Sequence, residues 1–303
     1  MAGEFDFIDW LRRQATPAAE LVLVPPGDDM GVLKWPAGEL LLVGADQVLD
    51  GVHFDSAVHA PRQIGRKAMN RNLSDCAAMA CLPAAALATV AAPRGIGLEY
   101  LKELYLGLRD AADPFGCAIV GGDTASWDGK LCLSVSILGR SAGVEPVTRS
   151  AARPGDVICV TGALGGSLLG RHMNFVPRVA EAIEIAKRTR PTSMIDVSDG
   201  LSRDLGHVCR ESGVGAIVSE ERVPVHADAI EMRRDGRSPL DHALHDGEDY
   251  ELLFTVHPDA MTRLPPGIKA SAIGVIAMGR GMLLERRDGS RQPLDPAGWE
   301  HGL

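Results

Sequence analysis

Aromatic residues are scarce in this chain of 303 residues, because Phe, Trp and Tyr together make up 4% of it. Hydrophobic residues still reach 46%, so alanine, leucine and valine must fill a core that suits one large or two ordinary domains. No apolar run reaches the ~18–20 residues of a membrane-spanning helix. Residues 1–10 are acidic and amphipathic, unlike a signal peptide. These features predict a cytoplasmic protein without a membrane partner.

Basic residues are also fewer than acidic ones: 31 Lys and Arg residues against 40 Asp and Glu residues give a formal net charge of −9. An acidic balance of this size argues against nucleic acid as a main partner. The six cysteines form no Cys-x-x-Cys pair, and most lie within apolar runs. We therefore expect buried free thiols in a reducing cytosol.

The common nucleotide-binding motifs are missing as well. The chain has no G-x-x-x-x-G-K-[ST] phosphate loop, no G-x-G-x-x-G fingerprint and no kinase loop with His-Arg-Asp. If the chain handles nucleotide phosphates, metal held by carboxylates must therefore do much of the work that a phosphate-loop lysine usually does.

A short segment that contains aspartate, usually beside glycine, serine or the end of an apolar run, recurs along the chain. It occupies residues 25–29, 43–46, 72–75, 121–124, 195–198 and 199–200. Each segment alone is an ordinary turn or helix-cap signal. Carboxylates repel one another unless positive charge lies between them, and Mg²⁺ usually bridges a few carboxylates to a phosphate-bearing substrate. Their recurrence predicts a magnesium–nucleotide enzyme.

Local patterns place these aspartates on different elements. A helix is predicted from Pro61 to about Ala80, so Asp75 lies among apolar residues on a helix and needs a partner there. A buried strand is predicted to end before Asp46, and residues 121–124 are typical of a turn.

The second half contains two further acidic segments. Ser198 or Asp199 is expected to cap the helix that begins at Leu201. Residues 245–251 form an acidic stretch before an apolar strand, for which a polar strand entrance is the simplest interpretation.

Strands and helices mix without a steady βαβ alternation, which favours an α+β fold over a doubly wound sheet. Turn signals concentrate at residues 141–143 and 152–156. We therefore expect two domains, residues 1–148 and residues 149–303.

Taken in order, the segments resemble the thiamine-monophosphate kinase family of the aminoimidazole ribonucleotide synthetase superfamily. The matching residues are 27–29, 46, 50–54, 72–75, 121–124, 149–151, 154–156, 196–201 and 247–252. They span nearly the whole chain. Gly-Val-His-Phe at 51–54 and Gly-Glu-Asp-Tyr-Glu-Leu at 247–252 point to this kinase family among its relatives.

The resemblance implies a two-domain α+β protein. A mixed α/β N-terminal domain would bind ATP and metal and pair through its sheet with a second copy in a homodimer, and an α+β C-terminal domain would follow. It also implies direct transfer of the ATP γ-phosphoryl group to thiamine monophosphate, assisted by Mg²⁺, without a covalent nucleophile on the protein.

Residue roles carried over from the family fall into three groups. The implied metal ligands are Asp29, Asp46, Asp75, Asp123, Asp196 and Asp199. The implied ATP contacts are Tyr105, Gly122, Asp123, Arg149 and Ser198. The implied contacts to the thiamine moiety are His53, Glu248 and Trp299.

Three departures from the family pattern concern the metal and acceptor sites. Gly44 and Ala45 stand where the family usually has hydroxyl residues, Asp246 replaces a common glycine, and the stretch between Gly170 and Met194 is shorter than usual. They leave two alternatives open: a superfamily member that phosphorylates another small acceptor, or a non-catalytic regulator that binds nucleotide or metal.

Overall fold

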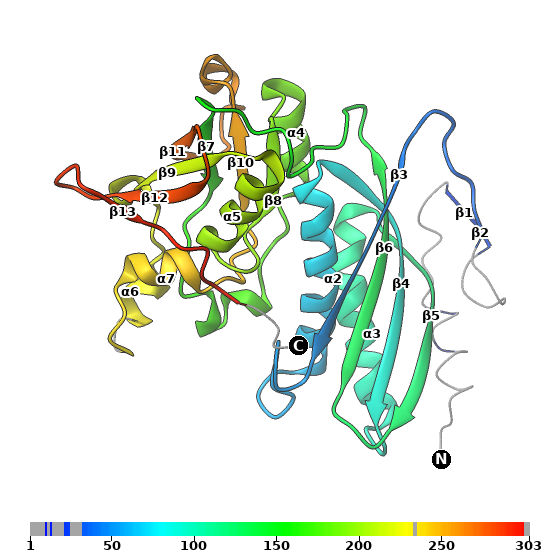
Figure 1. Ribbon diagram of the computed structural model, residues 1–303. Coiled ribbons are helices and arrows are strands. Elements are labelled where there is room, and N and C mark those ends of the chain that lie inside the picture. The colour runs from blue at the N-terminus through cyan, green and yellow to red at the C-terminus, as the bar shows by residue number, and fades with distance from the viewer. Residues whose placement is uncertain (1–9, 11–12, 14–20, 25–31, 233–234, 300–303) are drawn as a thin grey trace. The chain divides into compact units, whose positions relative to one another are not determined.

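Two units, each with its own β-sheet, make up the computed structural model (Figure 1). The structure describes residues 10, 13, 21–24, 32–232 and 235–299. The first unit comprises Met1–Cys76 and Cys81–Gly143, and the second comprises Ala77–Ala80 and Val144–Leu303. Helices and mostly antiparallel strands occur in both, which confirms the predicted α+β class.

In the first unit, helices cover one face of a four-stranded sheet (Figure 1). Its elements are β1 (Val22–Val24), β2 (Val32–Leu33), β3 (Leu41–Leu49), α2 (Pro61–Ala78), β4 (Cys81–Pro93), α3 (Leu98–Ala112), η1 (Asp113–Phe115), β5 (Ala118–Trp127) and β6 (Cys132–Ser141). The strand order is β3-β6-β4-β5, in which only β4 and β5 are parallel. The predicted helix from Pro61 is confirmed as α2, and Asp75 lies on it.

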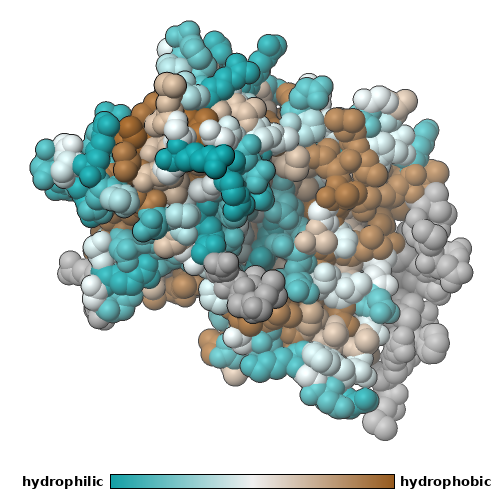
Figure 2. Space-filling view, in the orientation of Figure 1, coloured by the Kyte–Doolittle hydropathy of each residue, from teal (hydrophilic) through white to brown (hydrophobic). Residues whose placement is uncertain are grey.

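The two faces of this sheet differ in burial. Val48, Leu133 and Val135 are buried on the face that the helices cover. Val43 on the other face is 75% exposed, and its neighbours Leu41 and Leu87 are exposed as well. Figure 2 shows the resulting hydrophobic surface around the start of β3. Val22 and Leu33 of β1 and β2 pack on part of this apolar face, against Ala85 and Ala118, while Leu41 and Val43 stay exposed.

Two expected loops in the first unit are wrong. Asp46 lies within β3, because that strand stays paired with β6 as far as Leu49. Residues 121–124 continue β5 instead of forming a turn. The glycine at 122 serves strand pairing, since a Cβ there would lie 1.9 Å from the Ala88 carbonyl oxygen.

The second unit is built on a seven-stranded sheet of order β13-β12-β9-β11-β7-β10-β8, in which only β12 and β9 are parallel. Its strands are β7 (Val157–Thr161), β8 (Ser193–Asp196), β9 (Gly215–Ser219), β10 (Leu252–Val256), β11 (Ala270–Ala277), β12 (Gly281–Glu285) and β13 (Arg291–Pro293). Its helices are α4 (Val179–Thr189), α5 (Leu201–Ser212), α6 (Ala227–Met232) and α7 (Pro239–His245), with 3₁₀ turns η2 (Ser167–Leu169), η3 (Arg171–Met173), η4 (Glu220–Arg222) and η6 (Pro258–Arg263).

The apolar stripe of α5 closes the core of this unit. Leu201, Leu205 and Val208 recur at helical spacing and pack with buried strand residues such as Ile158 and Val160. This packing fixes the end of β8, which leads into α5.

All six cysteines are free thiols, and every one except the half-buried Cys132 is buried. Burial raises the pKa of Cys117 and of Cys159 to about 12. No helix in the described ranges is both long and apolar enough to cross a membrane.

Candidate active site

A carboxylate cluster lies where β8 ends and α5 begins. Asp196 is the last residue of β8 and is buried, and Asp204 in the first turns of α5 is 1% exposed. The Asp204 Oδ2 accepts hydrogen bonds from the N–H groups of Asp199 (3.1 Å) and Gly200 (3.2 Å). The expected cap by Ser198 or Asp199 is therefore wrong, because Gly200 holds that position without a side-chain bond. Asp204 reaches back to satisfy the free N–H groups instead.

The electrostatics of this cluster suit a cation. Burial raises the pKa of Asp204 well above its usual value, and the charges of Asp196 and Asp199 raise it further. One ligand atom from each of Asp199, Asp204 and His207 lies within 4.8 Å of the others. A hard divalent ion with oxygen ligands would relieve this repulsion. Sequence reasoning missed Asp204, although an aspartate between Leu201 and Leu205 was open to the argument applied to Asp75.

Positive charge lies beside the same cluster. Burial lowers the pKa of His207, and the nearby charges of Arg210 and Arg149 lower it further. Arg149 is exposed, and its carbonyl oxygen accepts a hydrogen bond from Ser212 Oγ at 3.2 Å. Guanidinium groups next to carboxylates that can hold a cation are suited to a polyphosphate ligand.

The acidic segment before β10, residues 245–251, forms backbone hydrogen bonds with the residues that follow β8. Val197 N–H donates to Glu251 O at 2.8 Å, Tyr250 N–H to Val197 O at 2.9 Å, and Glu248 N–H to Ser198 O at 2.7 Å. The C-terminal part joins at the same place, because Trp299 N–H donates to Asp199 O at 3.0 Å. The structure thus brings together Asp196, Ser198, Asp199, Glu248 and Trp299, to which the resemblance gives roles toward metal, ATP and the thiamine moiety.

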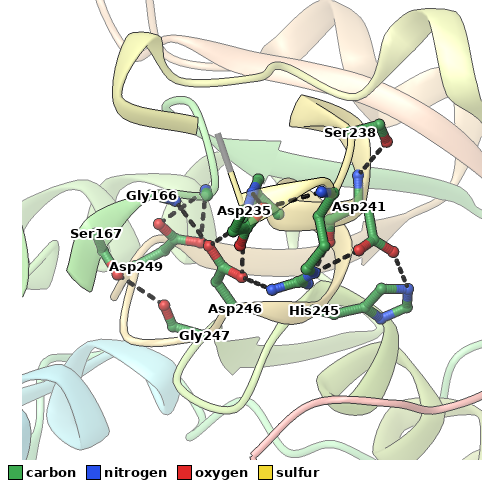
Figure 3. A network of polar contacts seen from close by, with 12 residues as sticks. Gly166, Ser167, Asp235, Ser238, Asp241, His245, Asp246, Gly247 and Asp249 are labelled. Carbon is green, nitrogen blue, oxygen red and sulfur yellow. Dashed lines mark hydrogen bonds and ion pairs between the residues drawn. The ribbon is translucent and has the colours of Figure 1, made fainter. Parts of the chain in front are cut away.

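The acidic segment also forms hydrogen bonds with the glycine-rich loop that follows β7, residues 162–167 (Figure 3). The Asp249 carboxylate accepts from Gly165 N–H at 3.0 Å, and Asp246 Oδ2 accepts from Gly166 N–H at 3.2 Å. Ser167 Oγ donates to Gly247 O at 2.8 Å. These contacts connect residues about 80 positions apart in the sequence. The segment is thus more than a polar strand entrance.

Arginines complete this framework. Arg171 Nη2 lies 3.2 Å from Asp249 Oδ1 and donates to Gly165 O at 2.8 Å. Arg178 binds both oxygens of Glu251, at 2.9 and 2.7 Å. Ion pairs of this kind position the loop, and neither Arg171 nor Arg178 was selected from the sequence.

Asp249 gives this framework a pH dependence. Burial raises the pKa of Asp249 from 3.8 to about 7, although Gly165 N–H and Arg171 favour its charged form. The folded state therefore holds this proton more tightly than the unfolded chain does. The stability that it contributes is present below about pH 4 and is lost as the pH rises to about 7.

We therefore expect the wild-type free energy of unfolding, relative to that of Asp249→Asn, to fall by on the order of a few kcal/mol between pH 4 and pH 7. Urea denaturation of both proteins across this range measures the difference. A difference that does not change with pH would contradict this assignment.

In the first unit, Asp46 and Asp75 come to the interface of β3 and α2. Asp46 N–H donates to Asn72 Oδ1 at 3.2 Å, and its carboxylate pairs with Arg71 Nε at 2.9 Å. A Cβ added to Gly44 would lie 4.0 Å from Asp75 Oδ2. The absence of a side chain at Gly44 therefore leaves space next to the Asp75 carboxylate.

The other described first-unit candidates lie outside β3 and α2, although the His53 carbonyl oxygen accepts a hydrogen bond from Lys67 of α2 at 2.6 Å. Asp123 is on β5 and pairs with Thr89, at the opposite edge of the sheet from Asp46. His53 Nδ1 accepts a hydrogen bond from Leu49 N–H at 3.1 Å. Tyr105 is buried, and its ring packs edge-on against that of Trp10. Asp29 lies outside the described residues.

Comparisons with known proteins give a consistent result. Residues 27–141 match the family described as AIR synthase related protein, N-terminal domain. Thiamine-monophosphate kinase of Rhodopirellula baltica is 39% identical over 99% of this chain and 97% of its own length. The crystal structure of thiamine-monophosphate kinase from Stenotrophomonas maltophilia aligns with a TM-score of 0.80 at 32% identity, covering 95% of this chain and 97% of that one. AaThiL complexed with AMPPCP and TMP aligns with a TM-score of 0.78 at 30% identity, covering 99% and 97%.

Proposed function

Because the chain belongs to the thiamine-monophosphate kinase family, we propose that it transfers the γ-phosphoryl group of ATP to thiamine monophosphate, giving thiamine diphosphate and ADP. The observation that carries this proposal is the match over nearly the whole chain, together with a related structure that binds AMPPCP, an ATP analogue, and TMP. The enzyme is then a transferase in thiamine diphosphate biosynthesis. The free, mostly buried thiols support a cytoplasmic location.

Magnesium fits the donor set of the second unit. Asp196, Asp199 and Asp204 offer oxygen ligands, and burial, followed by repulsion from Asp196 and Asp199, raises the pKa of Asp204. We propose that Asp196 and Asp199 hold Mg²⁺ there, and that Asp29, Asp46, Asp75 and Asp123 act as metal ligands in the first unit. Bound Mg²⁺ would screen the repulsion between the two phosphate-bearing substrates and stabilise charge on the transferring group.

The remaining assignments concern the substrates. We propose that Tyr105, Gly122, Asp123, Arg149 and Ser198 contact ATP and that His53, Glu248 and Trp299 contact the acceptor. Support comes from the second unit, where Ser198, Glu248 and Trp299 are linked through the backbone of residues 198–199. Residues 1–148 would form the dimer and contribute to ATP and metal binding in this proposal.

The reaction needs no nucleophile from the protein. A phosphate monoester has a second pKa near ~6, so the acceptor is largely deprotonated at neutral pH. The protein's own contribution is to orient the two substrates, through Arg149 at the polyphosphate and Glu248 at the acceptor. Anchoring the Glu248 segment in the buried hydrogen-bond framework keeps its part of this orientation fixed.

We also propose a homodimer formed through the four-stranded sheet. Its open face exposes Leu41, Val43 and Leu87, and an apolar face of this kind usually marks an interaction surface. A second copy of the same face would cover it symmetrically.

A charge on this exposed apolar face should separate the dimer. We expect Val43→Lys to reduce the mass measured by light scattering from twice the chain mass to the chain mass, because a buried lysine without a partner is costly. Val58→Lys is the matched control, since Val58 is 76% exposed on a loop outside the sheet. A Val43→Lys protein that stays dimeric would rule out this interface.

An acceptor panel tests the proposed reaction. Purified protein with Mg²⁺ and ATP is offered thiamine monophosphate, thiamine or another small phosphate monoester, and products are separated by chromatography. We expect a phosphorylated product from thiamine monophosphate alone. Phosphorylation of another acceptor would favour a divergent kinase, and no turnover with any acceptor would favour a regulator.

A further inference from the structure

Two neighbouring residues of η3 contact two neighbouring residues of the acidic segment. Arg171 binds Asp249, as described above. His172 Nδ1 lies 2.8 Å from Glu248 Oε2, and both side chains are largely buried. This double contact joins the stretch after the glycine-rich loop to the residue that we propose to bind the acceptor.

The Glu248 carboxylate is held at both oxygens. Oε2 meets His172 Nδ1 at 2.8 Å, and Oε1 lies 3.4 Å from the Tyr250 hydroxyl. An ionised carboxylate only accepts hydrogen bonds, so the imidazole donates through Nδ1–H. A glutamate side chain has several rotatable bonds, and these contacts help to fix its direction before a ligand arrives.

Two residues of the acidic segment, Glu248 and Tyr250, have strained backbone conformations that buried contacts hold in place. Glu248 has a φ of 53° and Tyr250 a φ of 52°, both in the left-handed region that L-residues avoid. Between them, Asp249 is buried and anchored by Gly165 and Arg171. Strain that is held in place by buried contacts is typical of ligand sites.

An aromatic pair supports the same arrangement. The Phe175 ring stacks on the Tyr250 ring, with centroids 3.8 Å apart and planes 11° from parallel. Both rings are buried, so the position of the Tyr250 hydroxyl is fixed by packing. Residues 171–175 thus supply contacts to Glu248, Asp249 and Tyr250 in turn.

We propose that His172 is a positioning residue for acceptor specificity, which acts by holding the Glu248 carboxylate toward an acceptor with a cationic or N–H-donating heteroaromatic ring. This inference rests on the proposed function, in which Glu248 contacts the acceptor. It places His172 on the acceptor side of the reaction, so ATP binding should not depend on it.

Three substitutions separate this role from a general structural one. His172→Asn keeps an N–H donor near the position of Nδ1, His172→Gln places its donor near Nε2 instead, and His172→Phe keeps the ring without a donor. We expect the His172→Phe and His172→Gln variants to have an acceptor KM about 10-fold or more above that of wild type, the scale of a lost hydrogen bond to a charged group. The Asn protein should stay close to wild type, and the KM for ATP should not change in any of them.

Steady-state kinetics with each substrate varied in turn, and calorimetric binding of thiamine monophosphate, supply the readouts. His257→Phe is the matched control, since His257 is an exposed histidine next to an aspartate. Equal acceptor KM values in wild type, Phe and Gln would overturn the inference while the proposed function stands. Parallel losses for ATP and acceptor would also overturn it. If wild type neither binds nor converts thiamine monophosphate, the proposed function fails and the inference with it.

Discussion

Replacing Asp199 by asparagine is expected to lower turnover at least ~100-fold, the scale of one lost electrostatic contact to a transition state. The amide keeps the shape of the side chain but removes its charge. The backbone N–H and carbonyl of residue 199 continue to bind Asp204 and Trp299, so the fold should be retained. The same loss is expected for Asp75→Asn on α2.

The measurement is kcat at saturating and at limiting Mg²⁺, with thermal melting as a check on folding. Asp259→Asn is the control, because the Asp259 side chain is 86% exposed. If both Asp75→Asn and Asp199→Asn turn over at near-normal rates at limiting Mg²⁺, the assignment of these carboxylates to the metal is wrong.

Glu248→Gln is expected to raise the acceptor KM about 10- to 100-fold and to leave the KM for ATP unchanged. Glutamine can still accept the hydrogen bond from His172, so the loop should hold its conformation. Only the negative charge offered to the acceptor is lost. The effect should therefore fall on acceptor binding and not on stability.

Kinetics with thiamine monophosphate varied at saturating ATP measure this effect. Glu221→Gln serves as the control, because Glu221 pairs with Arg287 at the surface of the same unit. An acceptor KM equal to that of wild type would show that Glu248 has no role in the acceptor pocket.

The sequence was most informative where local spacing decides the structure. Pro61 and the apolar positions after it predicted α2 closely, and with it the helical position of Asp75. The helix expected to begin at Leu201 is likewise confirmed as α5, which runs from Leu201 to Ser212. These elements depend on residues a few positions apart, which a single sequence contains.

Long-range contacts explain what the sequence did not show. Asp46 stays in β3 because β6, about 90 residues later, continues the hydrogen-bond ladder. Asp204 caps the start of its own helix from within, which the usual cap pattern does not describe. The glycine N–H groups that bind Asp246 and Asp249 lie in a loop that only the folded chain brings near.

The most direct test of the central claim follows the phosphoryl group itself. Purified protein is mixed with Mg²⁺, thiamine monophosphate and ATP that carries a radioactive γ-phosphate, and label is measured in thiamine diphosphate and in free phosphate. We predict labelled thiamine diphosphate in amounts equal to the ADP formed, with little free phosphate. ADP and labelled phosphate without labelled thiamine diphosphate would contradict direct transfer to this acceptor.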